Sequence, residues 1–286
     1  HGDLSIGSKH FLFLDVTGRN DWTSTLPINS RSYFYPSVSG SFVFSELLKD
    51  SGMDWLSSGK LRASWASVGS DLAPYSLDYQ YSPTSTVFLQ YISATAAVFT
   101  AGPISTAYTG PKIFPNQNLV PQRENSWEIG AELGFLQDRI NLDVTYYDNR
   151  TKNQLINISV PPSTGYFSKT VNAGTIDVKG IELNLDLVPV KTRDFSWDLS
   201  GNFAASQQKV LALAPSLTQY SVASGYSGLQ IKASVGQSFG IYGTDWARSP
   251  DGQYIIDATS GRRTTVQNKR VGSIYPDFTL GINNSF

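Results

Sequence analysis

The feature that most constrains the fold is a strict alternation of apolar and polar residues. It occurs in segments about nine to ten residues long, the length that a tilted strand needs to cross a bilayer. In the clearest segment, Trp127, Ile129 and Ala131 alternate with Glu128 and Gly130. The alternation recurs in residues 12–17, 37–42, 60–65, 139–146, 181–187, 195–203 and 278–286. The sequence therefore predicts about eight strands, each with one apolar and one polar face.

The connections between these segments alternate between short and long. The short ones are residues 45–59, 137–138 and 190–194, and the long ones are residues 18–36, 69–126, 148–177 and 205–277. Bacterial outer-membrane barrels have short periplasmic turns and long extracellular loops, whereas compact soluble domains rarely tolerate such loops. Aromatic residues at segment ends, such as Trp127, Phe135 and Tyr146, suit rings at headgroup level. The pattern favours a transmembrane antiparallel β-barrel over a soluble sandwich, whose apolar face would point inward.

Composition supports an all-β chain and excludes several classes of function. Aromatic residues make up 13% of the chain, beside 24 Gly and 14 Pro, which favours strands and turns. The net charge of −1 gives no field that would attract nucleic acid. There is no Cys, and the two histidines, His1 and His10, lie at the N-terminus, so a zinc site or a histidine-based triad is not available. We expect no catalytic residue, no metal and no cofactor, and an enzyme that uses paired carboxylates is kept as an alternative.

Several long motifs together cover nearly the whole chain. They are RNDWTSTLP and RSYFYPSVSGSFVFSE within residues 19–46, GKLRASWASVGSDLAPY (59–75), FPNQNLVPQRENSWEIGAELGF (114–135), INLDVTYYDNRTKNQL (140–155), NAGTIDVKGIELNL (172–185) and VGSIYPDFTLGINNSF (271–286). In sequence and in order, these motifs resemble one family, the SusC/RagA TonB-linked outer-membrane transporters of Bacteroidetes.

The resemblance implies a much larger protein in the bacterial outer membrane, with an N-terminal plug inside a barrel of roughly 22 strands. Residues 1–286 would then form part of that barrel, with the plug and the C-terminal strands outside this chain. The implied function is active uptake of an oligosaccharide or a peptide. The implied partners are a SusD-like surface lipoprotein, the TonB complex through the missing N-terminal part, and outer-membrane lipid. A self-contained small barrel ending at the aromatic Phe286, or an extracellular β-domain with a binding role, remains the alternative.

Charged residues on the polar faces are candidates for lining the interior of such a barrel. They would contact a plug or a hydrated solute path, or form a solvated wall of paired charges, and pair energetics favour the second interpretation. The predicted lumen-facing residues are Glu128, Glu132, Arg139, Asp143, Glu182, Asp186 and Asp198.

Aromatic residues in the long connections are candidates for substrate binding. Aromatic faces beside polar groups suit sugars or peptides, and exposed loops on a rigid scaffold often carry binding sites. Packing between loops is an equally good explanation. The candidates are Tyr33, Tyr35, Tyr75, Tyr79, Tyr166, Tyr242 and Trp246.

Overall fold

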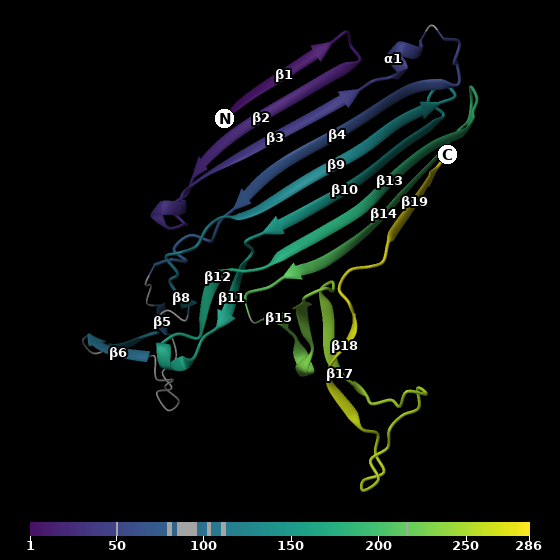
Figure 1. Cartoon of the computed structure of the whole chain (residues 1–286). Helices are drawn as coiled ribbons and strands as arrows, with labels where there is room; N and C mark the ends of the chain where they lie inside the picture. The colour runs from purple at the N-terminus through teal and green to yellow at the C-terminus, as the bar shows by residue number, and fades with distance from the viewer. Residues whose placement is uncertain (50, 79–81, 85–95, 102–103, 110–112, 216) are drawn as a thin grey trace.

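The main element of the chain is one antiparallel sheet of nine strands (Figure 1). The structure is a computed structural model, and it describes all residues except 50, 79–81, 85–95, 102–103, 110–112 and 216. The order of the strands in the sheet is β1-β2-β3-β4-β9-β10-β13-β14-β19. Their bounds are β1 (Gly2–Ser8), β2 (Leu12–Trp22), β3 (Ser32–Phe42), β4 (Leu56–Ser70), β9 (Gln122–Phe135), β10 (Ile140–Lys152), β13 (Thr175–Lys191), β14 (Ser196–Ala212) and β19 (Thr279–Ser285).

The register of the sheet joins the apolar residues into one face and the polar residues into the other. Leu142 on β10 lies opposite Leu133 on β9 and Leu185 on β13. The next residue, Asp143, lies opposite Glu132 and Asn184. Because side chains alternate between faces along a strand, this register makes one continuous apolar face and one continuous polar face.

The apolar face is not covered by any other part of the described chain. Ile129, Leu280 and Ile282 on this face are 55%, 61% and 72% exposed. The large side chains that are fully buried, Leu26 and Leu119 in connecting segments and Val210 near the end of β14, lie away from the middle of the sheet. A soluble sandwich would bury its apolar face, so the sheet needs an external apolar medium.

The short connections lie at one end of the sheet and the long connections at the other (Figure 1). The short end holds the β1–β2 turn, the turns before β10 and β14, and the helix α1 (Ser45–Leu48). The turn before β10 is tight because Leu136, Gln137 and Asp138 all have φ between 55° and 60°. Among the described residues, no helix has both the length and the apolar character needed to span a membrane.

The long connections form small sheets of their own. A three-stranded sheet has the order β11-β12-β8, with β11 (Leu155–Ser159), β12 (Ser168–Asn172) and β8 (Ile113–Phe114). A four-stranded sheet contains β15 (Gln219–Ser224), β16 (Gln230–Ser234), β17 (Gly240–Trp246) and β18 (Thr265–Ser273). A third sheet contains β5 (Ser82–Thr84), β6 (Ala96–Ala101) and β7 (Ile104–Thr109). Short 3₁₀ turns are η1 (Ile28–Ser30), η3 (Pro162–Thr164) and η4 (Tyr226–Gly228).

The structure confirms the alternating strands and corrects their number and length. The sheet has nine strands rather than about eight, because β1, which contains Gly2 and Gly7, gives a weak apolar pattern. The expected long connection at residues 18–36 is mostly strand, and only residues 23–31 join β2 to β3. The strands continue past the apolar band with polar residues on both faces, so alternation alone did not show their true ends.

Candidate functional site

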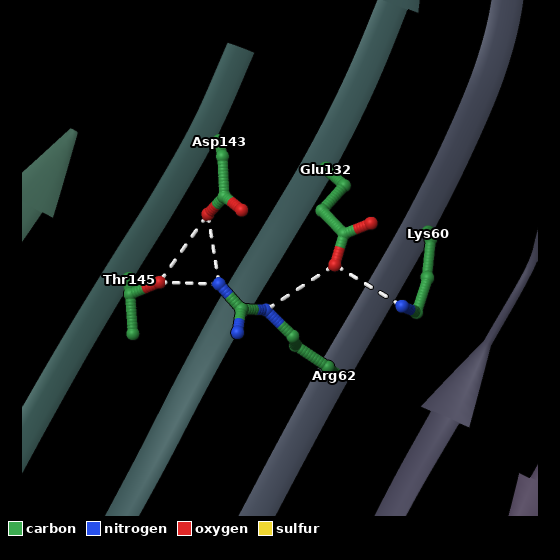
Figure 2. A network of polar contacts seen from close by, with 5 residues as sticks. All are labelled: Lys60, Arg62, Glu132, Asp143 and Thr145. Atoms are coloured by element: carbon green, nitrogen blue, oxygen red, sulfur yellow. Dashed lines mark hydrogen bonds and ion pairs between the residues drawn. The ribbon is translucent and has the colours of Figure 1, made fainter. Parts of the chain in front are cut away.

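A network of charged side chains crosses three strands on the polar face of the main sheet (Figure 2). Arg62 on β4 extends over β9, and its Nη2 donates to Asp143 Oδ1 at 2.8 Å and to Thr145 Oγ1 at 2.5 Å, both on β10. Lys60 Nζ lies 3.1 Å from Glu132 Oε1 on β9. The Nε atom of Arg62 lies 3.5 Å from the same oxygen. Two cations and two carboxylates therefore compensate one another across β4, β9 and β10.

Gly130 is what allows Arg62 to cross β9. It lies directly opposite Arg62 in the β4–β9 ladder and opposite Thr145 in the β9–β10 ladder. A Cβ atom at Gly130 would lie 2.6 Å from Arg62 Nε, closer than van der Waals contact allows. The absence of a side chain at this position therefore opens a passage for the guanidinium group across the strand.

The network makes the wall nearly neutral and adds little to the stability of the fold. Its four charged side chains are between 35% and 42% exposed. Ion pairs that are open to solvent contribute about 0.2 to 1 kcal/mol each, because water screens them and the side chains lose freedom. The wall is therefore a hydrated, nearly neutral surface at this point.

A shallow depression beside the network carries hydroxyl groups and acidic side chains. Its volume is about 230 Å³, and its lining includes Ser39, Ser41, Ser64, Asp15 and Glu128. Among the residues that the structure describes, Glu128 forms no ion pair. The depression offers hydrogen-bonding groups to water or to a polar solute.

The remaining predicted lumen-facing residues differ from this network. Glu182, Asp186 and Asp198 form no ion pair within the described part of the chain, although Ser196 Oγ donates to Asp198 Oδ2 at 3.0 Å. Arg139 lies in the turn just before β10 rather than in the strand. The wall of β13 and β14 is therefore more acidic than the wall of β4, β9 and β10. No three acidic or histidine side chains in the described ranges are grouped to hold a metal ion.

Two of the predicted loop aromatics belong to a small core at the long end of the sheet. Tyr33 is 9% exposed and packs with the fully buried Leu26 and Leu119. The ring of Tyr35 meets the ring of Tyr33 edge-on at 5.0 Å. Their position supports packing between loops rather than an exposed binding surface.

Tyr166 and Tyr242 are also buried. Tyr166 is 9% exposed, and its ring packs edge-on against Phe114 at 5.2 Å. Tyr242 is 7% exposed, and its hydroxyl lies 2.9 Å from Ser234 Oγ and donates to Gln237 Oε1 at 3.3 Å. Both tyrosines hold loop sheets together, so neither presents a free ring face.

Among the loop candidates, Tyr75 and Trp246 remain exposed. Tyr75 is 68% exposed and Trp246 is 43% exposed, with the Arg263 guanidinium 5.7 Å from a Trp246 ring. Tyr79 lies outside the residues that the structure describes. Sequence patterns could not separate these residues from the buried tyrosines, because burial here depends on contacts between distant loops.

A charged cluster on the apolar face of the main sheet lies where the apolar band ends. Arg150 Nε lies 2.9 Å from Asp177 Oδ1, and Lys179 Nζ lies 2.8 Å from Asp148 Oδ2. These residues share the face of Tyr146, one step further along β10 and β13. Asp148 and Asp177 are only 8% and 6% exposed, so their pairing prevents an uncompensated buried charge.

Aromatic rings lie at both boundaries of the apolar band. Trp127 and Tyr146 contact each other at 5.5 Å beside the charged cluster. At the opposite end, Trp55 stacks on Phe135 at 5.9 Å. An uncovered apolar band between two aromatic girdles, with a hydrated charged surface on the other face, defines the wall of an outer-membrane β-barrel.

The chain belongs to the TonB-dependent receptor family. Residues 5–284 match the family described as TonB dependent receptor-like, beta-barrel. The protein is therefore an outer-membrane protein, and its SusC/RagA resemblance is confirmed. Its relatives are receptors rather than enzymes.

Curated relatives come from two Bacteroidetes. TonB-dependent receptor SusC of Bacteroides thetaiotaomicron is 29% identical over 215 residues, which cover 74% of this chain and 20% of that protein. TonB-dependent receptor P3 of Formosa agariphila is 24% identical over 294 residues, covering 94% of this chain and 28% of that protein. The chain therefore spans between a fifth and three tenths of the length of these relatives.

Solved structures share the fold. The RagAB peptide transporter structure aligns with a TM-score of 0.75 at 20% identity and covers 99% of this chain and 30% of that chain. The RagAB peptide importer in its open-open state aligns with a TM-score of 0.74 and the same identity. At this identity the likeness establishes the architecture of the sheet and its loop sheets.

Proposed function

We propose that the whole protein imports an oligosaccharide or a peptide across the outer membrane, using energy delivered through TonB. The observation that carries this proposal is the two-faced sheet. Its apolar face suits lipid, and its polar face, with the Arg62 network and the hydroxyl-lined depression, suits a water-filled lumen. A SusD-like surface lipoprotein as partner follows from the relationship to SusC.

The open edges of the sheet support a larger barrel. β1 and β19 are the two ends of the strand order and do not pair with each other. Unpaired backbone groups in lipid cost several kcal/mol each, so a stable membrane sheet must close. We propose that further strands of the whole receptor pair with β1 and β19 and that a plug domain fills the lumen. A self-contained small barrel would require β1 to pair with β19.

The test of this proposal is energy-dependent uptake by the full-length receptor. Cells that express it should accumulate labelled neutral oligosaccharides or peptides when TonB is present and lose at least nine tenths of that uptake when TonB is deleted. Cells that do not express the receptor provide the control without a barrel. Uptake that continues without TonB would contradict the proposal.

A further inference from the structure

A pocket lies between two loop sheets at the long end of the polar face. Its volume is about 290 Å³, near the lower limit of typical small-ligand pockets. β11 contributes Leu155, Ile156 and Asn157 to one wall, and β15 contributes Tyr220 and Val222 to the other. The pocket therefore lies where a solute would enter the lumen from the end of the sheet that carries the long connections.

The base of the pocket is formed by buried apolar side chains. Ile176 on β13 and Ala233 on β16 are 6% and 3% exposed, and Leu213 and Phe239 complete this part of the lining. Ile176 belongs to the polar face of the main sheet by register, since its neighbour Asp177 lies on the outer face. The pocket is thus continuous with the wall of the predicted lumen.

None of the lining residues carries a charge. The polar groups are the amides of Gln122, Gln154 and Asn157 and the hydroxyl of Tyr220. This contrasts with the depression beside Arg62, where acids and cations are part of the lining. A charged ligand group would lose hydration here without gaining an ionic partner, so the pocket selects uncharged groups with an apolar surface.

Within the part of the chain that the structure describes, the two walls are also strand edges that pair with no further strand. β11 is the end strand of the order β11-β12-β8, and β15 is the end strand of the order β15-β16-β17-β18. Along the outer edge of such a strand, every second residue points its backbone N–H and C=O groups away from the sheet. An extended peptide can pair with an edge of this kind while its alternate side chains enter a neighbouring pocket.

We propose that this pocket binds an uncharged apolar side chain of an extended peptide whose backbone pairs with the edge of β11 or β15. This inference rests on the proposed import function and specifies the substrate class. Free strand edges distinguish a peptide from a sugar, because a sugar has no backbone that could continue a strand. The amide side chains beside the apolar base can form hydrogen bonds with the peptide groups that flank the bound side chain.

The test measures peptide binding to the purified full-length receptor in detergent by calorimetry. The probes are four blocked heptapeptides that differ only in the central residue, which is Leu, Phe, Gly or Asp, and maltoheptaose as a neutral oligosaccharide. The central Leu or Phe peptide should bind at least tenfold more tightly than the Gly or Asp peptide, because only the apolar side chain fills the pocket.

Two matched variants locate the site. Val222 and Val266 are both strand valines, 47% and 44% exposed, but only Val222 lines the pocket. Val222→Lys should weaken binding of the Leu peptide at least tenfold and make the Asp peptide the tightest-binding probe. Val266→Lys should change the affinity for neither peptide by more than twofold. Tighter binding of the Asp peptide by Val222→Lys is an effect that misfolding cannot produce.

Three results would overturn the inference. These are no binding of any peptide, equal binding of the Leu peptide to both variants, or maltoheptaose binding that Val222→Lys abolishes. Binding in detergent does not need TonB, so a failure here is separate from a failure of TonB-dependent uptake.

Discussion

The side-chain amide of Asn172 and the backbone of Val120 form a closed pair of hydrogen bonds. The N–H of Val120 donates to Asn172 Oδ1 at 2.8 Å, and Asn172 Nδ2 donates to the carbonyl oxygen of Val120 at 2.7 Å. The same Nδ2 donates to the carbonyl oxygen of Asn153 at 3.0 Å. One side chain thus joins the segment before β9, the end of β12 and the connection between β10 and β11.

Asn172→Ala should loosen the segment before β9. The substitution removes three hydrogen bonds at once, and because they are open to solvent we expect a loss of about 1 to 2 kcal/mol. Leu119, which is 1% exposed, should become accessible, so chymotrypsin should cleave the full-length receptor after Leu119 several times faster. Asn157→Ala is the control, since among the described residues the side chain of Asn157 accepts one hydrogen bond, from Thr170. Equal cleavage of the two variants would rule out this role for Asn172.

The two faces of the sheet should respond differently to arginine. Leu142→Arg or Leu185→Arg should cost about 2 to 4 kcal/mol near the bilayer midplane, because the guanidinium would face hydrocarbon. The matched changes Asn141→Arg and Asn184→Arg should cost much less, since these residues lie on the polar face. Denaturant titration of the full-length receptor folded into lipid vesicles measures the difference. Similar costs at both pairs of sites would contradict the assignment of the faces.

The alternation predicted the strand pairs well where one face meets lipid. Leu133, Leu142 and Leu185 lie in one row, as a period of two requires. It predicted the strand ends poorly, because beyond Tyr146 the outer face carries Asp148 and Arg150 and the apolar signal stops. The membrane sets the pattern, and a strand that continues into water no longer follows it.

Contacts between distant strands could not be predicted from the sequence. Arg62 and Asp143 are 81 residues apart, and their pairing depends on the register of β4, β9 and β10. The alternation predicted that Glu132 and Asp143 face the lumen, but it could not predict that Arg62 is their partner. The burial of Tyr33 likewise depends on Leu26 and Leu119, which come from separate connections.

Gly130→Ala should uncouple Arg62 from Asp143. The added methyl group would occupy the position over which the guanidinium crosses β9, so Arg62 would have to turn away from β10. A double-mutant cycle with Arg62→Met and Asp143→Asn should give a coupling of about 0.5 to 1 kcal/mol when Gly130 is present and close to zero in the Gly130→Ala background. In the control, Gly40→Ala, the new methyl meets no atom nearer than 3.8 Å and the coupling should persist. An unchanged coupling in Gly130→Ala would show that the guanidinium does not need this passage.

The loop around Asp257 should lose order in acid. The backbone N–H of Ser260 is the largest cause that holds the pKa of Asp257 below its ordinary value of 3.8, followed by the Ser260 hydroxyl and the N–H of Thr259. A carboxyl whose pKa is lower in the folded state stabilises the loop above the unfolded pKa and loses that effect as pH falls through the folded value. The protection of the Thr259 and Ser260 backbone amides against hydrogen exchange should therefore decrease when the pH is lower than about 4.

Asp257→Asn is the control for this pH effect, because it keeps an acceptor oxygen that does not titrate. Its amide protection should stay constant across the same pH range. Identical acid profiles for the two proteins would assign the change to another group.

The ends of the sheet should lie on opposite sides of the outer membrane, with the loop sheets outside the cell. The loop sheets all lie at one end, and the turn between β9 and β10, which contains Gln137, lies at the other (Figure 1). Outer-membrane barrels place long loops outside and short turns in the periplasm. The chain contains no Cys, so a single introduced thiol is specific within it. On intact cells expressing the full-length receptor, a membrane-impermeant maleimide should label Ile256→Cys, which replaces a side chain 52% exposed, and spare Gln137→Cys. After the cells are broken, both positions should react. Labelling of Gln137→Cys with protection of Ile256→Cys would invert the topology and place the pocket between β11 and β15 in the periplasm.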